Sequence, residues 1–187
     1  MKKVLFLHGR GGDGQENWFS WLKKELETRG FQVFNPELPN TDNPKLREQV
    51  DFISNYYEKI GKVDYIVGHS LGCLTAIHLI EKFDISSVNC IFVGPAYKGI
   101  TEEVGKNSLG DVYRNLKEYF DSVVLYKKLG NRYTIFLSDN DPYIKVDSAK
   151  NYYSKIENVK FLVFHNMGHF NEGASIKKLP EILDYLS

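Results

Sequence analysis

The chain has 187 residues, which is enough for one domain with a single core but short for two. Lysine plus arginine and aspartate plus glutamate number 24 each, so the formal net charge is zero and the charge balance favours neither nucleic acid nor an anionic membrane surface as a partner. Only four apolar residues, Val4–Leu7, follow the two lysines near the start, which is too short a run for a secretory signal or a membrane span.

Short apolar runs alternate with segments of helical periodicity along the chain. The runs, which we predict to be strands, are Val4–Leu7, Gln32–Asn35, Tyr65–Val67, Asn89–Val93, Thr134–Leu137 and Val159–Phe164. The predicted helical segments are Trp18–Arg29, Leu46–Tyr57, Leu71–Phe83, Ala149–Ile156 and Ser175–Leu186. Most of the runs are continuously apolar and rich in Val, Ile and Phe, which is typical of strands buried on both faces. The alternation predicts a mainly parallel sheet between two helical layers, with ligand sites at the carboxyl ends of the strands.

A glycine-rich loop, His8–Gly14, follows the first predicted strand and precedes a helix. Three of its glycines match the G-x-G-x-x-G spacing of a dinucleotide-binding loop. That interpretation also needs an acidic residue about 20 residues further on, at the end of the second strand. The second strand instead runs into Pro36, and the nearest acid, Glu37, lies beyond the proline. We therefore expect no nucleotide cofactor.

Ser70 lies at the centre of the sequence GHSLG, residues 68–72, which matches the pattern G-x-S-x-G. A predicted strand precedes it and a predicted helix follows, so Ser70 lies on a sharp strand-to-helix turn, where this motif supplies a nucleophilic serine. Glycines are expected on both sides, because a Cβ atom there would collide with the neighbouring helix and strand. The side chain of His69 should point away from that of Ser70, and we interpret His69 as structural support.

Two backbone N–H groups are expected to stabilise the negative charge that develops when Ser70 attacks a carbonyl carbon. One belongs to Leu71, at the start of the helix, and the other to Arg10 in the glycine-rich loop. The Arg10 side chain is then left to contact an acidic substrate group or to remain solvated. Trp18 and Trp21 have the spacing of core residues of a helix, although Trp18 lies near the loop and could form a wall of the substrate pocket.

The long segment Ala96–Arg132 separates the fourth and fifth predicted strands and has an amphipathic, helical character. We predict that it is a small cap-like excursion above the sheet, within a single domain spanning residues 1–187. A partial lid is one form that such an excursion could take.

Two carboxylates follow the predicted strand Thr134–Leu137 and are candidates for the acid that orients a catalytic histidine. Pro142 biases the preceding residue, Asp141, toward an extended backbone, which helps to hold its side chain in one direction. Asp139 is nearer the strand end, where it can cap the turn or accept from local backbone N–H groups. Asp141 is the favoured candidate and Asp139 the alternative.

A serine hydroxyl needs a positioned base to become a nucleophile at neutral pH, and the chain has five histidines. His169 lies in a loop just past the last predicted strand, at the same edge of the sheet as Ser70. The chain order serine, acid, histidine is also the order of enzymes built around this strand-turn-helix motif. His78 falls inside a predicted helix and His165 ends a strand, so His169 is the favoured base and His165 the alternative.

With these motifs in place, the chain resembles the YdeN-like small serine hydrolases, the group that includes retinoblastoma-binding protein nine. The resemblance runs nearly from end to end and is carried by LHGRGGDG, WFSWLKKELETRGFQV, GHSLG, SDNDPYI and MGHF. It implies a compact α/β-hydrolase fold with a reduced cap, a triad of Ser70, Asp141 and His169, and no cofactor. Family members often carry a histidine before the first tryptophan, whereas Asn17 precedes Trp18 here, which puts any inherited substrate preference in doubt.

We predict a serine hydrolase that cleaves small carboxylic esters, or amides, through an acyl-enzyme on Ser70. The prediction includes no metal, no nucleic-acid or membrane partner, and a monomer or weak dimer. The alternative is a protein-binding module that keeps the fold with little or no turnover, although it would not need an intact serine, acid and histidine. Cys73 and Cys90 lie in predicted buried elements without C-x-x-C spacing, which is typical of core thiols in a reduced, cytoplasmic protein.

Overall fold

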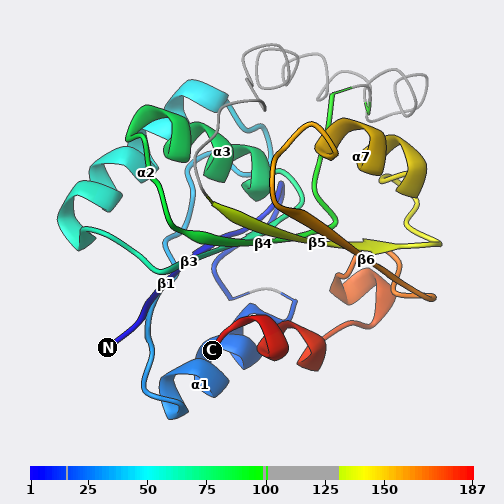
Figure 1. Cartoon of the computed structure of the whole chain (residues 1–187), viewed down its shortest axis with the longest axis horizontal. Helices are drawn as coiled ribbons and strands as arrows, with labels where there is room; N and C mark the ends of the chain where they lie inside the picture. The colour runs from blue at the N-terminus through cyan, green and yellow to red at the C-terminus, as the bar shows by residue number, and fades with distance from the viewer. Residues whose placement is uncertain (16, 99, 101–130) are drawn as a thin grey trace.

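A parallel sheet forms the centre of the molecule, as the alternation of strands and helices predicts. The computed structural model describes residues 1–15, 17–98, 100 and 131–187. Within these residues, six strands pair in the order β2-β1-β3-β4-β5-β6, and every neighbouring pair is parallel (Figure 1). The strands are β1 (Lys3–Leu7), β2 (Gln32–Phe34), β3 (Tyr65–His69), β4 (Asn89–Val93), β5 (Arg132–Ser138) and β6 (Val159–Phe164). The strands predicted from apolar runs are therefore confirmed, with shifts only at their ends.

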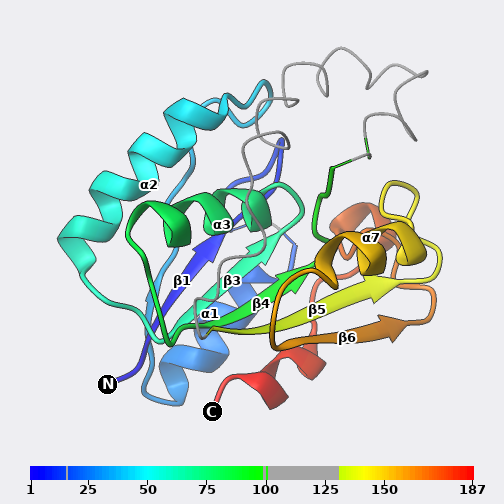
Figure 2. The same ribbon diagram turned by 45° about the horizontal axis from the view of Figure 1, so that its top comes forward.

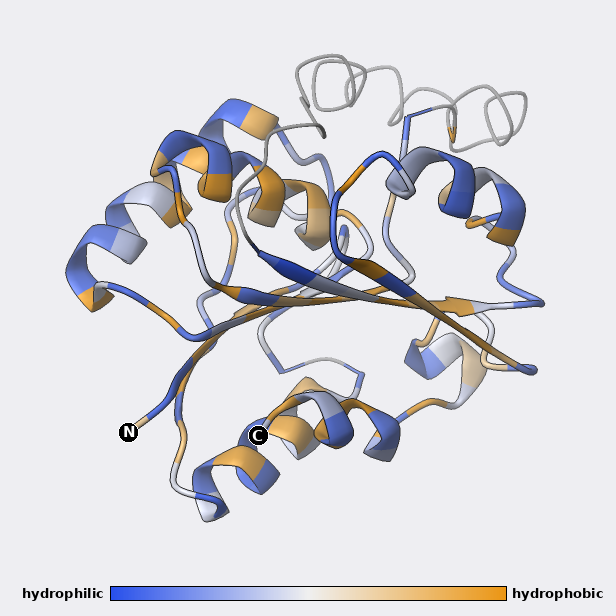
Figure 3. Ribbon diagram, in the orientation of Figure 1, coloured by the Kyte–Doolittle hydropathy of each residue, from blue (hydrophilic) through white to orange (hydrophobic). Residues whose placement is uncertain are grey.

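Helices cover both faces of the sheet, which gives three layers (Figure 1). On one face lie α2 (Leu46–Ile60), α3 (Gly72–Lys82) and α7 (Val146–Tyr153), and on the other lie α1 (Phe19–Thr28) and the C-terminal segment. Hydrophobic residues on the helices face the sheet and hydrophilic residues face outward (Figure 3), as amphipathic surface helices require. Helix α3 is buried along most of its length because it packs against β1, β3 and α2.

Two apolar clusters, one on each side of the sheet, form the core. Successive side chains of a strand point to opposite faces, so Leu5 and Leu7 of β1 join the cluster beneath α2 and α3. Val4 and Phe6 join the other cluster, which contains Trp18. All five side chains have no exposed surface. A strand buried on both faces must be apolar at every position, which explains the continuous runs in the sequence.

The last predicted helix differs from the observed structure. Residues 175–186 have helical periodicity, but the described chain forms two short 3-10 helices, η1 (Glu172–Ala174) and η2 (Pro180–Tyr185). Pro180 has no N–H to donate to an earlier turn, and its ring keeps the preceding residue out of the α region. Leu179 accordingly has φ −137° and ψ 72°, so the α-helix cannot continue through this point.

Parallel strands end at one edge of the sheet, and the loops that leave this edge carry the candidate site. The strands run side by side toward this edge (Figure 2), so the segments after β1, β3, β5 and β6 lie close together although they are far apart in sequence. The predicted excursion, Ala96–Arg132, lies for the most part outside the described residues. No helix among the described residues is long and apolar enough to span a membrane.

Candidate active site

The turn between β3 and α3 holds Ser70 in a strained backbone conformation. Ser70 has φ +52°, in the left-handed region that side chains other than glycine seldom adopt. A Cβ on Gly72 would lie 2.1 Å from the Leu7 carbonyl oxygen, and one on Gly68 would lie 3.0 Å from the backbone of Cys73. Both flanking glycines are therefore needed so that the helix can start against the sheet, as the motif predicts.

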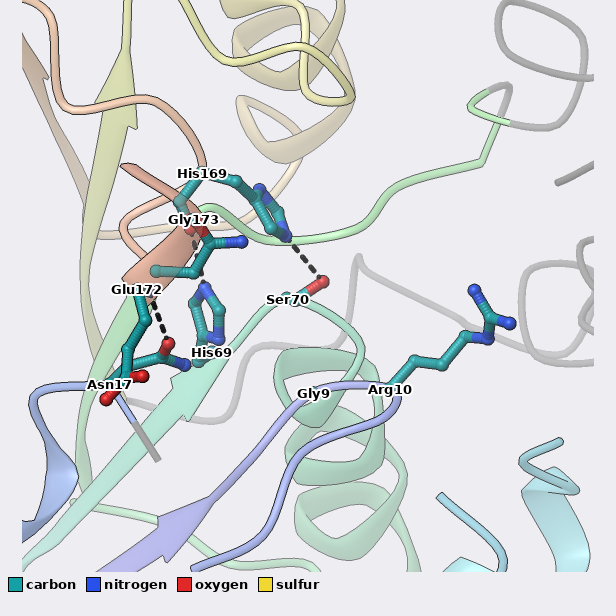
Figure 4. A pocket seen from close by; sticks show the side chains of 9 residues that line it. Gly9, Arg10, Asn17, His69, Ser70, His169, Glu172 and Gly173 are labelled. Atoms are coloured by element: carbon teal, nitrogen blue, oxygen red, sulfur yellow. Dashed lines mark hydrogen bonds between the residues drawn. The ribbon is translucent and has the colours of Figure 1, made fainter. Parts of the chain in front are cut away.

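A continuous row of hydrogen bonds joins three of the predicted residues. The Ser70 hydroxyl donates to Nε2 of His169 at 3.0 Å, and Nδ1–H of His169 donates to Oδ2 of Asp141 at 2.8 Å. The other carboxylate oxygen, Oδ1, accepts from the backbone N–H groups of Tyr143 and Ile144 at 2.9 and 3.0 Å. The Asp141 side chain is fully buried, so these contacts hold its carboxylate in one orientation. Figure 4 shows the imidazole of His169 directed at Ser70.

The alternative acid and base pair with each other instead of joining this row. Oδ2 of Asp139 lies 2.5 Å from Nδ1 of His165, and its Oδ1 accepts from the Asn166 N–H at 2.9 Å. These hydrogen bonds, led by the one from Asn166, lower the pKa of Asp139 below its usual range. His165 and Asp139 are both exposed side chains. His78 lies within α3, and its ring is 3.9 Å from the carboxylate of Glu81.

Two buried side chains hold the backbone of the loop that carries His169. Nε2–H of His69 donates to the carbonyl oxygen of His169 at 2.9 Å, and the indole N–H of Trp18 donates to that of Phe170 at 3.0 Å. Burial lowers the pKa of His69 to about 3, so His69 is neutral at physiological pH. Phe170 has φ +52°, and these two donors stabilise a loop that its sequence alone disfavours.

The glycine-rich loop after β1 lies directly against the serine. A Cβ on Gly9 would lie 2.9 Å from the Cβ of Ser70, so only glycine permits this approach. Nδ1 of His8 lies 3.0 Å from the Gly9 carbonyl oxygen, and its Nε2 accepts from the Leu38 N–H at 2.9 Å. Burial lowers the pKa of His8, which favours the neutral tautomer that makes both contacts. His8 thereby fixes the loop beside Ser70.

The two backbone N–H groups predicted to stabilise an oxyanion have no hydrogen-bond partner in the described part of the chain. The N–H of Leu71 belongs to the N-cap residue of α3, and that of Arg10 lies in the adjacent loop; neither donates to a carbonyl among the described residues. Free N–H groups at a helix N-terminus attract negative charge.

Gly94 completes the site and was not identified from the sequence. It follows β4 with φ +51°, and a Cβ there would lie 3.3 Å from the His169 ring and 3.5 Å from Oδ2 of Asp141. A side chain at position 94 would therefore press on the contact between the imidazole and the carboxylate. The only sequence signal is the Gly94-Pro95 pair at the end of a predicted strand, which is typical of many turns.

A pocket of about 200 Å³ opens over the serine. Its described lining residues come from the glycine-rich loop, the serine turn and the loop after β6: Gly9, Arg10, Asn17, His69, Ser70, His169, Asn171, Glu172 and Gly173 (Figure 4). Trp18, expected at its wall, has no exposed surface because its ring fills the core and its N–H is used by the Phe170 carbonyl. Among the described residues, no group of three or more His, Cys, Asp or Glu side chains could hold a metal ion.

Comparisons with known proteins agree with this architecture. The chain matches the serine hydrolase family over residues 4–187. It is 26% identical to YdeN of Bacillus subtilis strain 168 over 190 aligned residues, which cover 100% of this chain and 95% of YdeN. The crystal structure of the B. subtilis ydeN gene product superposes with a TM-score of 0.85 at 25% identity, covering 100% of this chain and 97% of that chain. A thermophilic esterase from Thermogutta terrifontis superposes with a TM-score of 0.72 at 14% identity, covering 100% and 89%. This chain therefore belongs to the serine hydrolase family and has the α/β-hydrolase fold.

Proposed function

We propose that the protein cleaves small carboxylic esters, and amides as a second substrate class, through an acyl-enzyme on Ser70. The observation that carries the proposal is the row from Ser70 through His169 to Asp141, with contacts of 3.0 and 2.8 Å. The N–H groups of Arg10 and Leu71, which have no partner among the described residues, and the structural similarity to a thermophilic esterase support the same chemistry. We also propose the cytoplasm as its location, because Cys73 and Cys90 are free, buried thiols.

In the first step, the Ser70 oxygen attacks the carbonyl carbon while its proton passes to Nε2 of His169. Asp141 accepts a hydrogen bond from Nδ1–H and stabilises the resulting imidazolium. The carbonyl oxygen becomes an oxyanion, which the N–H groups of Arg10 and Leu71 stabilise. The tetrahedral intermediate collapses, the bond from the carbonyl carbon to the leaving oxygen breaks, and His169 gives its proton to that oxygen, which departs as the alcohol.

In the second step, water attacks the acyl-enzyme. Its proton passes to His169, the oxyanion forms again, and the ester bond to Ser70 breaks as His169 reprotonates the serine oxygen. The acid product and free enzyme result. Loss of one oxyanion donor typically raises the barrier by about 3 kcal/mol, so the backbone conformation of the Arg10 and Leu71 segments is as important as the side chains.

Labelling of the nucleophile tests this proposal. We expect a fluorophosphonate probe to form an adduct on Ser70 in the folded protein, and Ser70→Ala to lower turnover of p-nitrophenyl butyrate by about 1000-fold or more. The melting temperature of the variant should stay close to that of the wild type. Ser154→Ala, which removes an exposed hydroxyl, is the matched control and should label normally. Wild-type turnover by Ser70→Ala would refute the assignment, and absence of labelling would favour a binding module.

A further inference from the structure

Arg10 contributes a charged group to the pocket that the proposed mechanism does not use. Only its backbone N–H takes part in the chemistry above, whereas its side chain lines the same pocket as Ser70 and His169. Figure 4 shows this side chain extending from the loop on one side of Ser70, with His169 on the other side. A substrate that extends from Ser70 along this side of the pocket would pass close to this side chain.

Among the described residues, the guanidinium of Arg10 has a backbone anchor and no carboxylate partner. Its Nε–H donates to the carbonyl oxygen of Asp42 at 3.1 Å, and the neighbouring N–H of Gly11 donates to the carbonyl of Thr41 at 2.8 Å. Asp42 thus contributes a carbonyl and not its carboxylate. Among the described residues, Arg10 forms no ion pair. The terminal NH2 groups have no partner in the described ranges, and together they form a planar pair of donors, the arrangement that binds a carboxylate in a bidentate manner.

One carboxylate also lines the pocket, and its position does not oppose this use of Arg10. Glu172 lies on the opposite side of Ser70, where its side chain is directed toward Asn17 (Figure 4). The Glu172 backbone N–H also donates to Oδ1 of Asn17 at 2.8 Å. The described lining therefore carries a negative charge on one side and a positive charge on the other, and an anionic substrate group is favoured on the side of Arg10.

The direction of the reaction indicates which part of the substrate meets Arg10. His169 must protonate the leaving alcohol, so the alcohol portion lies on the His169 side of the carbonyl carbon. The carbonyl oxygen is directed at the N–H groups of Arg10 and Leu71, and the acyl portion extends away from His169; the Arg10 side chain also lies on the side of Ser70 away from His169 (Figure 4). We propose that Arg10 is a specificity residue for acyl groups that end in a carboxylate, and that the preferred substrates are half-esters of short dicarboxylic acids. This inference rests on the proposed function.

A substrate pair that differs only in charge tests the inference. Monoethyl glutarate carries a terminal carboxylate, and ethyl glutaramate carries a neutral amide of nearly the same shape. We expect wild-type enzyme to prefer the half-ester in kcat/KM, measured by pH-stat, and Arg10→Gln to lower the ratio of the two values by about 10- to 100-fold. The ratio is the proper readout because both substrates use the same backbone N–H of Arg10. Arg29→Gln is the matched control, since Arg29 is an exposed arginine at the far end of α1, and it should keep the wild-type ratio.

Two results would overturn the inference: a wild-type ratio near one or below, or a ratio that Arg10→Gln leaves unchanged. A second pair, O-butyrylglycolate and its amide, carries the charge difference on the alcohol portion instead. If the enzyme prefers the carboxylate only in this second pair, the placement of the acyl group beside Arg10 is wrong. Any of these outcomes together with Ser70-dependent hydrolysis of ethyl glutaramate would leave the proposed function intact. Absence of Ser70-dependent hydrolysis of both esters would instead count against the proposed function.

Discussion

Asp139 and Asp141 are two residues apart, yet each contacts a different histidine. Asp141 is buried, and the N–H groups of Tyr143 and Ile144 fix one of its oxygens while the other reaches His169. Asp139 is exposed and reaches His165. A carboxylate that orients the predicted base must contact it, and of these two carboxylates only that of Asp141 contacts His169.

We expect Asp141→Asn to lower kcat/KM for p-nitrophenyl butyrate by about 1000-fold or more, because the amide cannot stabilise the imidazolium or hold the correct tautomer. Asp139→Asn should stay close to wild type, since the Asp139 side chain is exposed and contacts only His165 and the Asn166 N–H among the described residues, and the amide oxygen can still accept from that N–H. Steady-state kinetics of both variants beside the wild type provide the comparison. A larger loss in Asp139→Asn would reverse the assignment of the acid.

At the scale of elements, the serine turn depends on close contact between α3 and β1. The carbonyl of Leu7, the last residue of β1, occupies the position that a Cβ of Gly72 would need, at a separation of 2.1 Å. Both partners are backbone atoms of regular elements in the buried core, so neither can move without displacing its neighbours. The helix can begin here only because residue 72 has no side chain.

We expect Gly72→Ala to lower the free energy of unfolding by about 3 kcal/mol or more, because the added methyl group overpacks this contact. Gly30→Ala is a control for backbone strain alone. Gly30 has φ +82°, and a Cβ there would meet no atom within 4 Å. Gly30→Ala should therefore lower the free energy of unfolding by only about 1 kcal/mol. Urea unfolding followed by circular dichroism measures both values. An equal loss of unfolding free energy in the two variants would show that the contact between residue 72 and the Leu7 carbonyl does not require glycine.

At the scale of the whole molecule, two buried histidines link stability to pH. Burial lowers the pKa of His8, and burial lowers that of His69 to about 3. Between the unfolded pKa of about 6.5 and the folded value, the unfolded chain therefore binds protons that the folded chain does not. Above about pH 6.5 both histidines are neutral in either state, and the protein has its full free energy of unfolding. As the pH falls from 6.5 toward the folded pKa, that free energy decreases.

We expect the free energy of unfolding to fall below pH 6.5 by up to about 1.4 kcal/mol per pH unit for each of these histidines. His69→Gln removes one titrating group, while its amide nitrogen can still reach the carbonyl of His169, and should make the dependence less steep. Urea unfolding at pH 7.0, 6.0 and 5.0 tests this, in a range above the titration of most carboxylates. Equal slopes in the variant and the wild type would contradict a buried, neutral His69.

The amino-acid sequence by itself determined the parallel sheet, its helical layers and the serine turn, because these depend on local or periodic features. A strand buried on both faces must be apolar throughout, and the Gly68–Gly72 turn needs glycines at fixed positions. The end of the chain was less predictable: periodicity indicated a helix over residues 175–186, but Pro180 prevents an α-helix from running through Leu179, and the observed 3-10 helix begins at the proline.

Only the tertiary structure decided which distant groups meet. The pairing of Asp141 with His169, the role of Gly94 beside them and the indole contact from Trp18 to Phe170 all join residues from different elements. Sequence pattern places such residues at one edge of the sheet, but the contacts depend on distances of a few ångströms and on φ values set by packing.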